Sequence, residues 1–138
     1  MGQVDPEDRR KHLEFIQGVV ARLAQNSFLI KGWATTVFTG VFLLLLKSDL
    51  CSVRQVAVLL APTLVFWLLD GYYLAQERRF RDHFTRVARG EVRDPFNMTP
   101  PPVGWCDYGR VLFSRTVVPI YLLSLVGVVL LWWGGVCR

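Results

Sequence analysis

The sequence predicts an all-α fold: a polytopic membrane protein with three transmembrane helices, an N-terminal amphipathic helix and a cytoplasmic extension of the second transmembrane helix. Hydrophobic residues make up 52% of the 138 residues, and the mean hydropathy is +0.32. A soluble domain of this size is usually more polar. The apolar residues are concentrated in three runs of about 20 residues, each long enough as a helix to cross a hydrocarbon core of about 30 Å. Helices are expected because an open sheet leaves backbone groups unsatisfied in lipid.

The predicted elements follow one another along the chain in a simple order. A helix begins at Asp5-Pro6 and carries an apolar stripe of Leu13, Ile16, Val20 and Leu23. The second apolar run should continue as one helix to about Arg89, with Gly90 as its stop. The segments are an amphipathic helix at 1–27, transmembrane helix 1 at 28–46, an external loop at 47–54, transmembrane helix 2 at 55–74, a cytoplasmic helix extension and Pro-rich connector at 75–115, and transmembrane helix 3 at 116–136.

The distribution of Lys and Arg predicts the orientation in the membrane. Thirteen of these residues lie before or at the start of the first run, or between the second and third runs, and three lie on the other side. Cytoplasmic segments carry the excess of Lys and Arg, so the N-terminus is expected in the cytoplasm and the C-terminus outside. This rule also accounts for the net charge of +5, and no nucleic-acid partner is expected.

Two charged residues lie inside the apolar runs at matching depth. Lys31 precedes Lys47 by sixteen residues, and Asp70 follows Arg54 by sixteen residues. In an antiparallel hairpin both reach about 24 Å from the outer edge, near the cytoplasmic interface. A lone charge at such a depth is costly, so an intramembrane polar pair is expected. The spacing favours a clamp that registers the two helices; a polar path for ions or protons is the alternative.

Small residues recur at every fourth position in the first two runs. They are Gly32, Thr36 and Gly40 in the first run, and Ala57 and Ala61 in the second. Faces of small residues allow helix backbones to approach closely. With three spans in each chain, we expect some of these helix-packing faces to contact other copies, which predicts a homo-oligomer in the lipid bilayer.

The three cysteines form no CxxC pair, and no Cys/His cluster has the spacing of metal ligands, so neither a metal nor a cofactor is expected. In the predicted topology Cys51 and Cys137 lie outside and Cys106 lies in the cytoplasm. Cys51 and Cys137 form a possible disulfide, within one chain or between copies, and two free thiols are the slightly favoured alternative.

Enzyme chemistry is not predicted. The sequence has no phosphate-binding loop, nucleophile elbow or paired carboxylates. Arg78 and His83 are spaced as in the short Arg/His motif of some ribonucleases, but five residues apart is a poor spacing for one helix face. His12 is expected to be a solvated helix residue and not a ligand.

Two stretches, "NSFLIKGWATTVFTGVFLLLL" from Asn26 and "FWLLDGYYLAQERRFR" from Phe66, resemble a family of small uncharacterised bacterial inner-membrane proteins. Its members read approximately N-S-F-x-x-K-G-W and F-W-x-L-D-x-Y-Y-L-x-Q-E-R-x-F-R, and the match covers about residues 12–86. The resemblance implies that one constellation includes Asn26, Lys31, Trp33, Asp70, Tyr73, Gln76, Glu77 and Arg78. Small membrane proteins of this general sort often accompany bacterial antiviral modules as membrane-disrupting effectors, an association and not a mechanism.

Two functions are therefore carried forward. The leading one is a self-associating inner-membrane protein that forms a pore or depolarises the membrane as an effector of a defence module. The alternative is a non-conducting membrane subunit that anchors a cytoplasmic protein partner through its Arg-rich stem.

Overall fold

The computed structural model describes residues 5–46, 53–92, 94, 97–102 and 104–133. These residues form four helices and no strand, so the all-α prediction is confirmed. The helices are α1 (Pro6–Leu46), α2 (Val53–Ala88), α3 (Trp105–Leu112) and α4 (Val118–Trp133).

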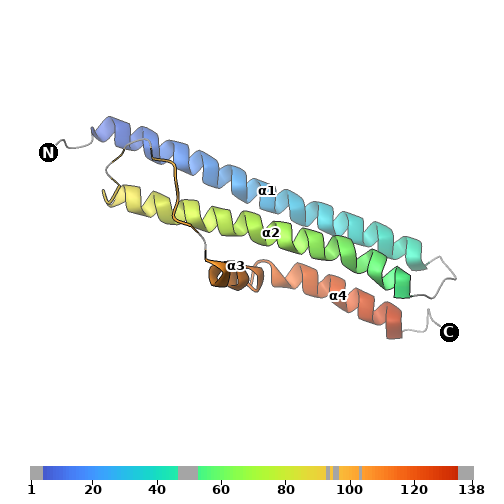
Figure 1. The fold of residues 1–138 in the computed structure, drawn as a ribbon. Helices are drawn as coiled ribbons and strands as arrows, with labels where there is room; N and C mark the ends of the chain where they lie inside the picture. The colour runs from blue at the N-terminus through green and yellow to red at the C-terminus, as the bar shows by residue number, and fades with distance from the viewer. Residues whose placement is uncertain (1–4, 47–52, 93, 95–96, 103, 134–138) are drawn as a thin grey trace.

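Helices α1 and α2 form a long antiparallel hairpin (Figure 1). The start of α1 follows directly from its sequence. The Asp5 carboxylate accepts a hydrogen bond from the backbone N–H of Glu7 at 3.0 Å, Pro6 occupies the first helical position, and Glu7 and Asp8 supply negative charge to the first turn. These three features satisfy free N–H groups and complement the helix dipole.

The end of α2 is a Schellman motif at the predicted stop. Gly90 has φ 75°, a left-handed conformation that glycine adopts without a Cβ penalty. The N–H of Glu91 donates to the carbonyl of Arg86, and the N–H of Gly90 donates to the carbonyl of Val87, both at 3.0 Å. The guanidinium of Arg9 on α1 donates to the carbonyl of Ala88, which ties the start of α1 to this end.

The predicted amphipathic helix at 1–27 and the first apolar run at 28–46 are parts of one helix of 41 residues. No proline interrupts the backbone hydrogen bonds after Pro6, so the helix continues across the change in polarity. The hairpin therefore has two halves. We call residues 28–46 and 56–74 the apolar half, and residues 6–27 and 75–88 the stem.

Two helices, Pro6–Leu46 and Val56–Ala88, are long and apolar enough to cross a membrane. Only 6% and 17% of their most apolar windows are buried within the chain, whereas the core helix of a soluble protein is mostly buried. Helix α4 has 16 residues, fewer than the predicted third span at 116–136, whose last residues lie outside the described part of the chain.

The segment after α2 returns along the stem to the middle of the hairpin, where α3 crosses α2 and α4 then follows the apolar half (Figure 1). Helix α3 lies within the predicted connector, and the sequence analysis missed it. Gly104 provides an extended residue before its first turn, and Asp107 places a negative charge in that turn. Eight residues are too few for a helical period to stand out against a Pro-rich neighbourhood.

Helix α3 is held on α2 by one close approach and two hydrogen bonds. A Cβ added to Gly71 would overlap the Leu112 side chain, so α2 and α3 approach closely at this glycine. The Trp67 indole N–H donates to the Leu112 carbonyl at 3.1 Å, and the Tyr108 hydroxyl donates to the Leu68 carbonyl at 2.8 Å. Burial raises the pKa of the Tyr108 hydroxyl above its ordinary value.

Helix α4 packs against both helices of the apolar half. Ala34, Val117 and Tyr121 are buried together, and the Tyr121 hydroxyl donates to the carbonyl of Phe66 at 3.0 Å. Farther along, Gly127 of α4 lies so close to Phe38 of α1 that an added Cβ would be 3.1 Å from the ring.

Candidate functional site

A buried polar cluster lies where the apolar half meets the stem. Asp70 of α2 has 0% exposure, and its Oδ1 atom accepts hydrogen bonds from Ser27 Oγ at 2.6 Å and from Lys31 Nζ at 2.5 Å. Lys31 Nζ also donates to Ser27 Oγ at 2.8 Å. The structure thus brings together the predicted pair Lys31 and Asp70.

Ser27 is the member of this cluster that the sequence analysis did not single out. It lies one helical turn before Lys31 on α1, so both side chains project toward the same point of α2. The available signal was this i, i+4 spacing of a hydroxyl and an ammonium inside an apolar run. That spacing is also common on solvated helix faces, so it did not stand out.

The second carboxylate oxygen of Asp70 is left without a partner. Oδ2 is buried and accepts no hydrogen bond from the residues that the structure describes. An unpaired buried oxygen costs free energy. Both hydrogen bonds of the Asp70 carboxylate, from Ser27 and Lys31, are made by Oδ1. Such a cluster fixes the register of α1 against α2, because sliding either helix by one residue separates Lys31 from Asp70.

The motif residues that the resemblance groups together divide among separate contacts. Gln76 accepts a hydrogen bond from Arg79 at 2.8 Å, and Glu77 forms an ion pair with Arg81 at 2.6 Å. Other members have different surroundings: Trp33 is 63% exposed, Arg78 is exposed, Asn26 is half-buried, and the Tyr73 ring packs edge-to-face with Tyr72 at 5.6 Å. Lys31 and Asp70 are thus joined directly, while Gln76 and Glu77 bond along their own helix.

The small-residue faces do not form the contact between α1 and α2 within one chain. The five predicted helix-packing residues are all exposed: Gly32, Thr36, Gly40, Ala57 and Ala61. A Cβ added to Gly32 or Gly40 would meet nothing within 4 Å, and the Thr36 hydroxyl donates to the Gly32 carbonyl of its own helix. Contact with other copies through these faces stays a prediction.

A second buried polar group joins the returning segment to the stem. His12 of α1 and His83 of α2 are each 2% exposed, and both direct Nε2 at the carbonyl oxygen of Asn97, at 3.0 and 2.7 Å. Their rings lie 5.9 Å apart, edge to face. We call this group the histidine latch.

The histidine latch corrects the expectation that His12 is solvated, and it bears on the Arg78/His83 spacing that resembles a ribonuclease motif. His12 is not solvated, because it lies one turn before buried Ile16 on the face of α1 that packs on α2. His83 is buried while Arg78 is exposed, so these two residues lie in different surroundings on α2.

Arg79 fastens the same segment closer to the apolar half. Its Nε donates to the Pro101 carbonyl at 2.7 Å, and its two terminal nitrogens donate to the Pro100 carbonyl at 3.3 Å and to Gln76. A guanidinium only donates hydrogen bonds, and the carbonyls of Pro100 and Pro101, which lie outside the helices, are its acceptors here. The latch and Arg79 together place α3 at the crossing with Gly71.

Cys51 and Cys137 lie outside the described residues, and the disulfide between them stays a prediction. Cys106 is a free, exposed thiol on α3. Within the described ranges, no group of three His, Cys, Asp or Glu side chains is arranged to hold a metal ion.

The contacts of the site thus position structural elements. The Asp70 cluster sets the register of the hairpin, and the histidine latch and Arg79 position α3. Comparison of the chain with protein-family models, with curated proteins and with solved structures gives no match in any of the three. The family resemblance of the two motifs therefore stays a prediction.

Proposed function

We propose that this chain is a self-associating protein of the bacterial inner membrane, with three spans, a cytoplasmic N-terminus and stem, and an external C-terminus. The exposed apolar side chains support insertion. Phe28, Leu44, Leu123 and Leu130 are each more than 60% exposed, although they lie on two helices, α1 and α4, that pack together. An exposed apolar surface of this extent marks a surface that contacts lipid or protein.

The proposed third span is α4, together with the residues that follow it. In Figure 1, α4 lies along the apolar half and ends near the same end of the hairpin as the C-terminal end of α1. Its 16 residues reach about 24 Å as a helix, so the following residues would complete a core of about 30 Å.

Of the two functions considered, the geometry favours the non-conducting membrane subunit that anchors a cytoplasmic partner. The observation that carries this choice is the Asp70 cluster: the Asp70 side chain is 0% exposed, and its charge is balanced by Lys31 of the same chain, whose side chain is 17% exposed. Three deeper hydroxyl groups donate to their own helix and do not extend a path: Thr35 donates to Lys31, Thr63 to Leu59, and Ser124 to Ile120.

The stem supplies the surface for such a partner. It extends α1 by more than five helical turns beyond the apolar half, and Arg10 and Arg22 are exposed along it. Exposed arginines suit an acidic protein surface, and rim charges of this kind govern the rate of encounter.

A pore or depolarising effector is the second candidate. The exposed face of Gly32, Thr36 and Gly40 favours it, because close approach of several copies there would bring their α1 helices around a common axis. In that assembly the cluster of Asp70 would lie near the inner mouth.

Membrane potential in cells that overproduce the chain separates the two functions. For a non-conducting subunit, a potential-sensitive dye should give the same signal for the chain, for Asp70→Asn and for cells without the chain. Depolarisation that disappears in Asp70→Asn would establish the effector and overturn the subunit.

The anchoring role is tested on the stem itself. A soluble protein should co-purify with the chain, and the charge reversal Arg10→Glu/Arg22→Glu should abolish its capture. The matched control is Arg10→Lys/Arg22→Lys, which keeps both charges. Capture that is indifferent to charge reversal would exclude the Arg-rich stem as the docking surface.

A further inference from the structure

A cavity of mixed charge lies on the stem side of the α3 crossing. Its volume is about 260 Å³, and its charged lining comes from Arg78, Arg79 and Asp82 of α2 and from Asp107 and Arg110 of α3. Pro101 of the returning segment closes one side. The volume corresponds to about eight or nine water molecules, enough for a small polar group.

Not all of these charges are available to a ligand. The guanidinium of Arg79 is occupied by Pro100, Pro101 and Gln76. Arg110 and Asp107 approach only to 3.8 Å, and both side chains are exposed, so solvent screens this pair and makes it weak. Arg78 and Asp82 are exposed and have no recorded ion pair among the described residues. The cavity therefore offers two cations, Arg78 and Arg110, and two carboxylates, Asp82 and Asp107.

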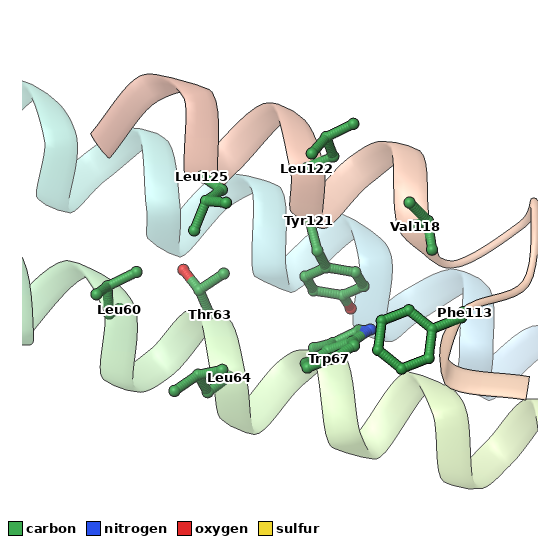
Figure 2. Close-up of a pocket in the computed structure, with 9 residues that line it drawn as sticks. All are labelled: Leu60, Thr63, Leu64, Trp67, Phe113, Val118, Tyr121, Leu122 and Leu125. Carbon is green, nitrogen blue, oxygen red and sulfur yellow. The ribbon is translucent and has the colours of Figure 1, made fainter. Parts of the chain in front are cut away.

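The cavity shares one face of α2 with an apolar pocket on the far side of α3. That pocket has a volume of about 220 Å³ and lies between α2 and α4, where Tyr121 and Leu125 of α4 point toward Trp67 and Thr63 of α2 (Figure 2). The residues of α2 that mark this face follow at intervals of three and four: Leu60, Leu64, Trp67, Gly71, Ala75, Arg78 and Asp82.

The position of the cavity sets the kind of molecule that reaches it. It begins one turn beyond Gly71, where the apolar half ends, and exposed Tyr72 lies next to Gly71 on α2. Aromatic residues of this kind gather where lipid head groups meet the hydrocarbon. In the membrane orientation proposed above, the charged cavity faces the head groups of the inner leaflet and the apolar pocket faces their acyl chains.

We propose that this cavity binds the head group of a phospholipid that carries both a phosphate and a primary ammonium, as phosphatidylethanolamine does. Guanidinium groups pair with phosphate oxygens through parallel N–H donors, which fits Arg78 and Arg110. An ammonium has three N–H donors, which Asp82 and Asp107 accept. One acyl chain of the bound lipid then runs past Phe113 toward the apolar pocket.

The balance of charge selects this head group over the other common ones. A phosphatidylglycerol head group has a phosphate but no cation, so it leaves Asp82 and Asp107 facing an anion. A phosphatidylcholine head group has a cation without N–H donors, so the two carboxylates receive no hydrogen bond. A site rejects the wrong ligand when that ligand leaves polar groups of the site unpaired, as Asp82 and Asp107 would be here.

The inference rests on the proposed insertion into a membrane, and the test separates the two. The full chain is purified in mild detergent and titrated with phosphatidylethanolamine, phosphatidylcholine and phosphatidylglycerol of identical acyl chains, and lipid binding is read by native mass spectrometry. Phosphatidylethanolamine should bind about tenfold more tightly than either other lipid, a difference of about 1.4 kcal/mol.

The variants assign the binding to the cavity. Arg110→Gln and Asp82→Asn should each reduce phosphatidylethanolamine binding to the level of phosphatidylcholine. Arg115→Gln is the matched control, because Arg115 is an exposed arginine just after α3 that does not line the cavity. Equal binding of the three lipids, or equal losses in Arg110→Gln and Arg115→Gln, would overturn the site.

Two further measurements complete the test. Soluble glycerophosphoethanolamine should not displace the lipid at equal concentration; displacement would assign the cavity to a soluble ligand instead. Carbonate extraction of cell membranes reports insertion independently. A chain that resists extraction but binds all lipids equally loses the lipid site and keeps the proposed function, whereas an extractable chain loses both.

Discussion

Lys31 of α1 and Asp70 of α2 form a buried ion pair with 2.5 Å between Nζ and Oδ1, and Ser27 closes the same cluster by bonding to both. Removal of Lys31 leaves the buried Asp70 carboxyl with a single hydrogen-bond donor, the hydroxyl of Ser27. We expect Lys31→Met to lower the unfolding free energy by about 3 kcal/mol or more, because a buried charge without its partner costs more than the pair gains. Denaturant titration of helical content in detergent measures the change.

The exchange Lys31→Asp/Asp70→Lys tests the pairing itself. It should recover part of the stability that either single change removes, because the two charges still meet, although Ser27 is then placed for the other partner. A double variant whose loss equals the sum of the two single losses would show that the residues are not coupled.

Gly71→Ala should detach α3. The new Cβ would overlap the Leu112 side chain, and we expect a cost of about 2 kcal/mol from this overpacking. Loss of the Trp67 hydrogen bond to Leu112 should shift the indole fluorescence. Leu112→Ala in the same chain should relieve the clash, and Gly18→Ala on α1, where an added Cβ meets nothing within 4 Å, is the neutral control.

The histidine latch should protect the returning segment from proteases. His83→Ala removes the 2.7 Å bond to Asn97, and loss of one hydrogen bond of about 1 kcal/mol raises the open population about fivefold. Limited proteolysis within residues 89–104 should accelerate by that factor. Thr85→Ala serves as the control, because its hydroxyl bonds only along its own helix. Equal cleavage of both variants would show that the histidine latch does not protect the returning segment.

The proposed topology predicts which thiols react outside sealed cells. An impermeant maleimide should label Cys51 and Cys137 but not Cys106, although Cys106 is exposed on the chain. Cys106 should react once the membrane is opened. Labelling of Cys106 in sealed cells would reverse the orientation, and labelling of the outer pair only after reduction would reveal the disulfide.

The small-residue face predicts the assembly state. Gly40→Leu should weaken association of copies by about 1–2 kcal/mol while leaving the single chain intact, because an added Cβ at this position meets nothing within 4 Å. Cross-linking in nanodiscs measures the association. If Gly40→Leu associates as strongly as the wild-type chain, the small-residue face is not part of the interface.

The fold was predictable where a local rule decides it. Asp5-Pro6 and Gly90 mark helix ends through capping chemistry, and equal spacing from the turn placed Lys31 opposite Asp70. The contacts of the returning segment depend on pairing across long stretches of sequence. His12 contacts Asn97 at a separation of 85 residues. The need for a small residue at Gly71 depends on its contact with Leu112. Residue types alone do not reveal such partners, and α3 was missed for this reason.

Helices α1 and α2 continue without interruption from the apolar half into the stem, with lengths of 41 and 36 residues. Two rods joined by a buried clamp behave as a stiff lever with its fulcrum at Asp70. In the proposed orientation, tilting the hairpin by about 10° would move the far end of the stem, about 30 Å away, by about 5 Å. A change in bilayer thickness or in the packing of copies would thus reach the cytoplasm as a displacement, with no hinge and no unfolding.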